Sequence, residues 1–416
     1  MLLRRQVFVP RAIRSLHNVA GTPIPYSWLR DSCQCPHCVH PSTSQKLHRT
    51  SDVLHPYRST VKSESRNEEG LRITWGDDHS SFYPVRFLER YARSEILSNF
   101  HRRIIAKPWN RMSITETSSL FINYTSLSSS TGLVTAIEQL SQYGLLFVSG
   151  VPNLKTSNEE CELRILAERF GEIRPTFYGL LWNVINKRNS KNIAYTNLSL
   201  DLHMDLLYFQ HPPRYQILHC LRNKVLGGTS VFVDGFHAAE TLRTQSPSSF
   251  ATLASTPVPF QYINDGHHLY HTHPTIALDP VQSLHSAPAE ARTIAHINYS
   301  PPFQAPFPLD RSPDEFDKFY RSLRQFADLL DGSEGRYEYT MREGDAVIFD
   351  NRRVLHARTA FEDILGQEVK EGEASRWLKG CYLEADAILD RYRVIKARLA
   401  REASSGSLNH ELEWGI

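Results

Sequence analysis

The sequence predicts a mainly β protein with flanking helices, whose larger part is a sandwich or barrel of short strands. Four short apolar segments bounded by Gly, Pro or Asp are typical of strands, and they lie at residues 143–151, 214–221, 229–236 and 345–351. Well-marked helices between them are few, which favours a sandwich or barrel over a helical fold. The chain has 416 residues, of which 41% are hydrophobic and 22% charged, enough for two or three domains with a full core.

Composition divides the chain into four regions. Residues 1–105 hold a cysteine cluster, a strand-like segment at 71–75 and a helix expected around 87–100, and they predict a small N-terminal domain. Residues 106–132 are rich in Ser and Thr without a helical period, and they predict a linker. Residues 133–402 predict one large domain, and residues 403–416 a C-terminal tail.

Three helices are marked in the large domain. Ser157 and Glu160 form a capping-box pattern that opens a helix to about Phe170. The run Ser312-Pro313-Asp314-Glu315 is a second such pattern, with proline at the first helical position and acids near the positive end of the helix dipole. A last helix is expected over residues 387–400.

Charge and hydropathy exclude two classes of protein. The 47 basic and 45 acidic side chains give a formal charge of +2, which argues against an obligate nucleic-acid binder. No apolar run reaches the ~18–20 residues that span a bilayer. Residues 1–18 hold four arginines, and no acid precedes Asp31, which is typical of a mitochondrial targeting segment. The alternatives are a short basic tail and the remainder of an incomplete first strand, so the expected location is mitochondrial or cytoplasmic.

Cysteine and histidine usage points to metals. Three of the six cysteines crowd into Cys33-Gln-Cys35-Pro-His37-Cys38, and in a reducing compartment such a cluster favours metal ligation over disulfides. The remaining three are isolated, and we expect them to be buried small hydrophobes (Cys161, Cys220 and Cys381). The chain also has 19 histidines, the commonest metal ligand, with the densest cluster at residues 267–273.

The most informative segment is His203-Met204-Asp205. Residues i and i+2 of a strand share a face, so His203 and Asp205 can ligate one ion. With the distant His356 they make the two-histidine, one-carboxylate set of non-haem Fe(II) oxygenases. Arg376 begins a strand-like segment, where a guanidinium could hold a carboxylate bidentately. The alternatives are a hydrogen-bonded His–Asp pair and a solvent-exposed arginine.

Several motifs in order carry a family resemblance. The succession HMD, GGTSVFVDGF, FDNRRVLHAR and RWLKGCYLE resembles the 2-oxoglutarate-dependent dioxygenases of the TauD/TfdA type. Within them it is most similar to the γ-butyrobetaine and trimethyllysine dioxygenases, from about Trp28 to Leu399. The segments WLRDSCQCPHC and ITWGDDHS resemble the small zinc-binding domain at the N-terminus of those enzymes.

The resemblance implies a fold, cofactors and site residues. It implies a double-stranded β-helix (jelly-roll) catalytic domain after a small zinc-binding domain, in an enzyme that uses O₂, Fe(II) and 2-oxoglutarate, supported by ascorbate, and forms a homodimer. Fe(II) would be bound by His203, Asp205 and His356, and the distal carboxylate of 2-oxoglutarate by Arg376, with the Ser230 hydroxyl nearby. Structural Zn(II) would be bound by Cys33, Cys35, Cys38 and His79.

The resemblance also implies a cage for a trimethylammonium group. Its aromatic members would be Tyr178, Trp182, Tyr195 and Tyr382, and cation–π attraction suits a cation that cannot donate hydrogen bonds. Asn192 favours γ-butyrobetaine, since an amide donates to a carboxylate, whereas the trimethyllysine enzymes have an acid there. Two departures are Ser300, where the family has a second Asn for the carboxylate, and a longer acidic insert at residues 361–375.

The expected function is therefore the hydroxylation of γ-butyrobetaine to L-carnitine, in carnitine biosynthesis. The alternatives are a trimethyllysine dioxygenase and a relative that acts on another trimethylammonium compound or small carboxylate. A catalytically silent zinc-dependent binding protein is the alternative from a different class. The histidine cluster at 267–273 receives no role.

Overall fold

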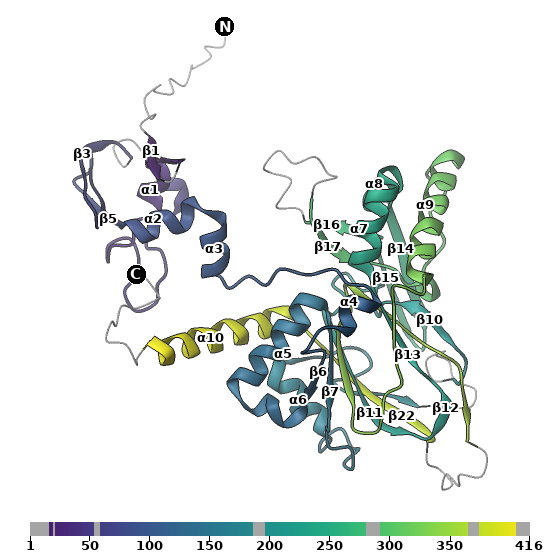
Figure 1. Ribbon diagram of the computed structural model, residues 1–416. Helices are drawn as coiled ribbons and strands as arrows, with labels where there is room; N and C mark the ends of the chain where they lie inside the picture. The colour runs from purple at the N-terminus through teal and green to yellow at the C-terminus, as the bar shows by residue number, and fades with distance from the viewer. Residues whose placement is uncertain are drawn as a thin grey trace. The chain divides into compact units, whose positions relative to one another are not determined.

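The computed structural model describes residues 16–19, 21–53, 59–185, 196–279, 292–364 and 374–404 (Figure 1). The chain divides into two compact units, residues 1–103 with 402–416, and residues 104–401. Several expectations lie outside the described residues: most of the basic segment 1–18 and of the C-terminal tail, part of the acidic insert, and the site residues Asn192 and Tyr195.

The smaller unit is built around a three-stranded antiparallel sheet in the order β3-β4-β5, beside the hairpin β1-β2. Its strands are β1 Leu16–Val19, β2 Thr22–Pro25, β3 Val61–Arg66, β4 Gly70–Trp75 and β5 Ser80–Pro84, and its helices are α1 Tyr26–Asp31, η1 Thr50–Asp52, α2 Val85–Ala92 and α3 Ser94–Phe100. Ile73 and Trp75 on β4 are fully buried with Leu29 of α1. The helix expected at 87–100 is two helices, because Arg93 has an extended backbone.

Residues 106–132, for which the sequence predicts a linker, carry short helices and a strand. This segment belongs to the larger unit, and it forms α4 Arg111–Thr115, β6 Phe121–Asn123, η2 Tyr124–Ser128 and the start of α5 Ser130–Tyr143. Its polar residues cap short elements: the Ser129 hydroxyl, for example, accepts a hydrogen bond from the Gly132 amide at the start of α5. Its few apolar residues, Ile114, Leu120 and Leu127 among them, are buried.

The larger unit is a jelly roll of two sheets, as expected. The major sheet has the order β6-β7-β19-β11-β22-β8, with β9 also paired to β22, and the minor sheet has the order β10-β20-β13-β18. The strands of the major sheet are β7 Leu145–Ser149, β8 Ile173–Arg174, β9 Trp182–Ile185, β11 Tyr215–Asn223, β19 Ala346–Asp350 and β22 Arg376–Leu383, together with β6; those of the minor sheet are β10 Leu200–His203, β13 Ser230–Asp234, β18 Arg336–Tyr339 and β20 Val354–Arg358.

The major sheet is covered on both faces, which explains its continuous apolar strands. On β19, Val347 and Phe349 face the core between the sheets, whereas Ala346 and Ile348 face the cluster under the helices. The helices of that cluster are α5, α6 Glu162–Phe170 and α10 Ala385–Ser404 (Figure 1). The expected terminal helix is confirmed as α10, while α6 begins at Glu162, after the turn in which Ser157 accepts from the Glu160 amide.

The remaining elements flank the minor sheet and the sheet edges. They are the helices α7 Gly235–Gln245, α8 Pro247–Ser255, η6 Pro301–Phe303 and α9 Pro313–Asp331, and the strand pairs β12 Val225–Gly227 with β21 Phe361–Asp363, β14 Pro257–Asn264 with β15 His267–Pro274, and β16 Ile276–Leu278 with β17 Ile294–Ile297. The capping box at Ser312 and Glu315 is confirmed at the start of α9. Among the described helices, none is long and apolar enough to cross a membrane.

Candidate active site

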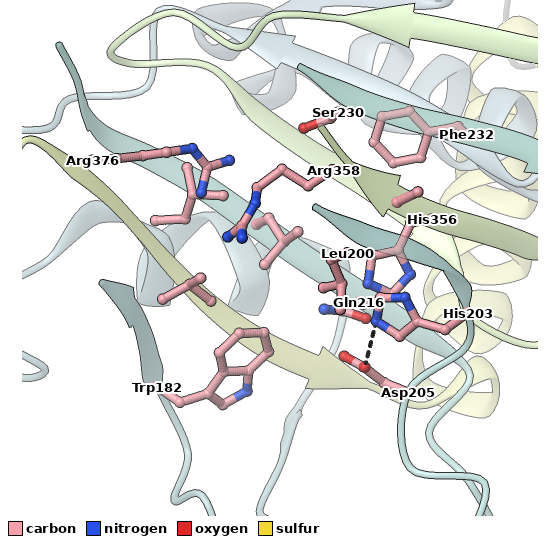
Figure 2. Close-up of a pocket in the computed structure, with 14 residues that line it drawn as sticks. Trp182, Leu200, His203, Asp205, Gln216, Ser230, Phe232, His356, Arg358 and Arg376 are labelled. Carbon is pink, nitrogen blue, oxygen red and sulfur yellow. Dashed lines mark ion pairs between the residues drawn. The ribbon is translucent and has the colours of Figure 1, made fainter. Parts of the chain in front are cut away.

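Three candidate metal ligands meet at the open end of the minor sheet. His203 at the end of β10 lies opposite His356 on β20 in the strand register. Asp205 follows β10, and its Oδ1 is 3.4 Å from the Nε2 of His203 (Figure 2). One ligand atom from each of the three residues lies within 4.8 Å of the others, so they can hold one metal ion.

The chain after β10 leaves the strand, and Asn351 fixes its path. The Asn351 side chain accepts from the Asp205 amide at 2.8 Å and donates to the Asp205 carbonyl at 3.0 Å. Asn351 was not predicted from the sequence. The sequence feature that could have indicated it is an asparagine directly after a buried strand, in FDN. A side-chain amide there can accept from a backbone NH and donate to a backbone carbonyl.

Hydrogen bonds orient the ligands. The Nδ1 of His203 lies 2.8 Å from the Asp201 carbonyl, which it can only approach as a donor, so Nε2 keeps its lone pair for a metal. The Tyr382 hydroxyl donates to the second carboxylate oxygen of Asp205 at 2.9 Å. Each ligand therefore has a fixed orientation.

The protonation states suit metal binding. Burial raises the pKa of the Asp205 carboxyl, but its contacts with His203 and His356 and the hydrogen bond from Tyr382 outweigh burial and hold the pKa below its usual value. Burial and, after it, the neighbouring His203 lower the pKa of His356 to about 3. A carboxylate beside a neutral imidazole is the form in which both groups ligate metals.

The three residues close one end of a cavity (Figure 2). The cavity holds about 570 Å³ of space not filled by atoms, including the solvent at its open mouth. At the other end lie Ser230, Arg358 and Arg376, and most of the lining between is apolar, with Trp182 on one wall. Buried polar atoms without a hydrogen-bond partner gather around it: Trp182 Nε1, Gln216 Oε1 and Arg376 Nε.

Two guanidinium groups give the far end of the cavity a positive charge. Burial lowers the pKa of Arg376 and of Arg358 to about 10, so both stay charged at neutral pH. Arg358 donates to the carbonyls of Thr196 and Leu198 at 2.8 and 2.6 Å. A Cβ on Gly228, whose φ is +68°, would lie 3.1 Å from the Nε of Arg376, so this glycine leaves room for the guanidinium. The cavity can therefore bind a ligand with an anionic end.

The structure brings some of the expected substrate residues together. The rings of Trp182 and Tyr382 have centroids 5.2 Å apart, and Tyr178 packs against the same hydrophobic cluster. Ser300 is buried, with an unpartnered hydroxyl, and does not line the cavity. The side-chain amide of Asn298, two residues earlier, is already hydrogen-bonded within the protein. It accepts from Arg352 at 2.8 Å and donates to the Pro274 carbonyl at 2.7 Å.

The smaller unit has a second candidate metal centre. The sulfurs of Cys33, Cys35 and Cys38 lie 3.4, 3.6 and 3.5 Å from the Nε2 of His79. Ligands of a tetrahedral zinc are separated by about 3.5 Å, since metal–ligand bonds are about 2.0–2.3 Å long. The hydrogen bond from Cys38, followed by those from His79 and Ser81, lowers the pKa of the Cys33 thiol to about 4.

The histidines of the β14–β15 hairpin form no such centre. Among the described residues, the two groups above are the ones with three or more ligands close enough for one ion. His273 is buried, with its Nε2 2.9 Å from the Phe209 carbonyl, and its ring centroid lies 4.6 Å from that of His271. The excess of histidine in this hairpin is therefore not explained by metal binding within the described chain.

Comparison with known proteins adds two family matches. Residues 115–382 match the model of the "Taurine catabolism dioxygenase TauD, TfdA family", and residues 18–89 match "Gamma-butyrobetaine hydroxylase-like, N-terminal". The chain is 52% identical to "Dioxygenase str8" of Strobilurus tenacellus, over 89% of this chain and 85% of that one. It is 33% identical to "Gamma-butyrobetaine dioxygenase" of Pseudomonas sp. (strain AK-1), over 90% and 91%. It is 30% identical to "Trimethyllysine dioxygenase, mitochondrial" of Gallus gallus, over 89% and 82%.

Proposed function

Since the chain belongs to the TauD, TfdA family and is a 2-oxoglutarate-dependent dioxygenase, we propose that it hydroxylates γ-butyrobetaine to L-carnitine. The observation that supports this best is the cavity, with three convergent metal ligands at one end, two guanidiniums at the other and Trp182 on its wall, where the ring of Tyr382 lies 5.2 Å from the indole. The smaller unit would hold a structural Zn(II) through Cys33, Cys35, Cys38 and His79, a closed set without a free position for chemistry.

The residues of the cavity fit Fe(II) and 2-oxoglutarate. His203, Asp205 and His356 would hold Fe(II), with positions left open for the co-substrate and O₂. When bound, the iron supplies the oxidation, in which 2-oxoglutarate and O₂ become succinate and CO₂ while one oxygen atom enters a C–H bond of the substrate. Arg376 would hold the distal carboxylate, since its buried Nε has no other partner, and Ser230 would contact the same end.

The aromatic pair supports a cationic substrate. A trimethylammonium group cannot donate hydrogen bonds, so the indole of Trp182, which lines the cavity, would offer its best polar contact. Tyr382 packs 5.2 Å from that indole, and Tyr178 remains a cage candidate by resemblance. The apolar walls would exclude water while the iron site is oxidising. The carboxylate of γ-butyrobetaine would need donors at the other end of the substrate, for which Asn192 is our candidate by resemblance.

A second candidate is another small trimethylammonium compound, without a terminal carboxylate. It is favoured by Ser300, which does not line the cavity, and by Asn298, whose amide is already bonded. Trimethyllysine is a further candidate substrate, because it carries the same cation. The three substrates differ at the end away from the cage, so one assay can separate them.

The test is substrate-dependent release of succinate, compared with the amount of hydroxylated product. We expect turnover with γ-butyrobetaine, with equal amounts of succinate and L-carnitine. Trp182→Leu should raise the KM for γ-butyrobetaine by about 10-fold or more, since a desolvated cation–π contact contributes about 2 kcal/mol. Trp377→Leu is the matched control, because Trp377 lies on the same strand pair but bonds Asn183 through its indole NH at 2.9 Å. Turnover with trimethyllysine and none with γ-butyrobetaine would contradict the proposal.

A further inference from the structure

One buried polar side chain of the cavity has no role in the proposed site. Gln216 lies on β11, and its exposed fraction is 1%. Its neighbours Tyr215 and Ile217 face the cluster under the helices, whereas Gln216 and Leu218 face the cavity. In Figure 2 Gln216 is drawn at the end of the cavity where the candidate metal ligands lie.

The carboxamide of Gln216 makes no hydrogen bond that would stabilise the described fold. Its Oε1 is buried without a hydrogen-bond partner. No hydrogen bond joins its Nε2, which is not among the fully buried unpartnered atoms, to another described residue. Burying an amide without partners opposes folding, and a leucine of similar volume would avoid that penalty. A buried strand that keeps such a group is typical of a binding site, where the amide NH₂ is left to donate to a ligand.

We infer that Gln216 is a further binding residue of the active site and contacts the 2-oxo acid end of 2-oxoglutarate. This inference rests on the proposed use of that co-substrate. Arg376 and Ser230 lie at the opposite end of the cavity, and the neutral NH donors among the other lining residues are the Gln216 amide and the Trp182 indole. The Nε2 of Gln216 donates to an oxygen of the 2-oxo acid, a charge-assisted bond that the described fold leaves open.

The position of Gln216 makes the contact specific. It stands opposite Tyr382 and Phe349 in the strand register, in the middle of the major sheet. Tyr382 in turn donates to the metal ligand Asp205. The carboxamide is therefore held by a rigid strand at a fixed place relative to the metal ligands, as a residue that orients a co-substrate should be.

The test compares Gln216→Leu and Gln216→Met with a matched control. The measurements are the affinity of the Fe(II)-loaded enzyme for 2-oxoglutarate, by anaerobic calorimetry, the affinity for Fe(II) alone, and the midpoint of thermal unfolding. The control is Gln139→Leu, since Gln139 is a buried glutamine whose Nε2 donates to the Leu145 carbonyl at 3.1 Å. Methionine is unbranched like glutamine, so it separates the loss of hydrogen bonding from a change of shape.

We expect both Gln216 variants to bind 2-oxoglutarate about 10- to 100-fold more weakly, because a hydrogen bond to a charged group is lost. Their affinity for Fe(II) and their unfolding midpoint should be unchanged, or the midpoint higher. Gln139→Leu should show the reverse, a lower midpoint with wild-type affinity. Wild-type affinity for 2-oxoglutarate in both Gln216 variants would overturn the inference while leaving the proposed function in place. Failure of the wild-type protein to bind 2-oxoglutarate would overturn both, whereas the absence of turnover with γ-butyrobetaine would bear on the substrate alone.

Discussion

Gly380 should be the residue that allows Trp182 to lie flat in the wall of the cavity. The two are opposite each other in the register of β22 and β9. A Cβ on Gly380 would lie 2.4, 2.6 and 2.6 Å from three atoms of the Trp182 indole, Cη2, Cζ2 and Cζ3. Carbon atoms attract at separations of about 3.5–4.0 Å, so in Gly380→Ala the indole has to move by about 1 Å.

The indole has little freedom to move. Its exposed fraction is 9%, and its ring centroid is 5.2 Å from that of Tyr382. Overpacking of this kind costs about 1–3 kcal/mol of unfolding free energy. If Trp182 contacts the cation, its displacement should also raise the KM for γ-butyrobetaine about 5- to 30-fold, equivalent to about 1–2 kcal/mol of cation–π attraction.

The assays are denaturant unfolding, the KM for γ-butyrobetaine, and the affinity for 2-oxoglutarate, which should stay within about twofold because Arg376 lies at the other end of the strand. Gly335→Ala is the control, since a Cβ there would meet its neighbours at 3.6 Å or more. A Gly380→Ala protein with wild-type stability and wild-type KM would refute the role of this glycine.

Three further perturbations test other parts of the structure. Arg376→Lys should raise the KM for 2-oxoglutarate about 10- to 100-fold by removing a bidentate carboxylate contact, and an unchanged KM would exclude this arginine from the co-substrate site. Asp234→Asn should lower the unfolding free energy by about 3–5 kcal/mol, because it weakens a fully buried pair with Arg353 at 2.8–2.9 Å. Denaturant unfolding measures the loss, and a loss under about 1 kcal/mol would contradict it. Cys35→Ser should release zinc and lower the stability of the smaller unit while the iron content stays unchanged, as metal analysis would show; retention of a full equivalent of zinc would contradict that site.

The fold was largely predictable because its strongest signals are local. The strands at 143–151, 214–221, 229–236 and 345–351 are short apolar runs, and the helix α9 begins at the capping box formed by Ser312 and Glu315. The segment 106–132 was not predictable in the same way. Its Ser and Thr residues stabilise the ends of short elements, and its buried residues contact partners distant in the sequence, so no periodic pattern marks it.

Some residues of the candidate site were also predictable from local sequence, and others were not. His203 and Asp205 are two residues apart, and a spacing of this kind is visible in a sequence. Asn351 and Gln216 depend on the strand register, which places them near residues more than 130 positions away. Gln216 does leave one signal, as a polar residue within the strand RYQILHCL, since a strand buried on both faces is expected to be mainly apolar.

The most direct measurement is an anaerobic titration of the protein with Fe(II) and then with 2-oxoglutarate, followed by the absorption of the iron complex. We expect the wild-type protein to bind a single equivalent of Fe(II) per chain, and 2-oxoglutarate only when the iron is present. His203→Ala should lose both, because the remaining carboxylate and imidazole no longer complete the ligand set. Equal binding of Fe(II) by the wild-type protein and by His203→Ala, or binding of 2-oxoglutarate that does not depend on iron, would contradict the assignment of this cavity as the active site.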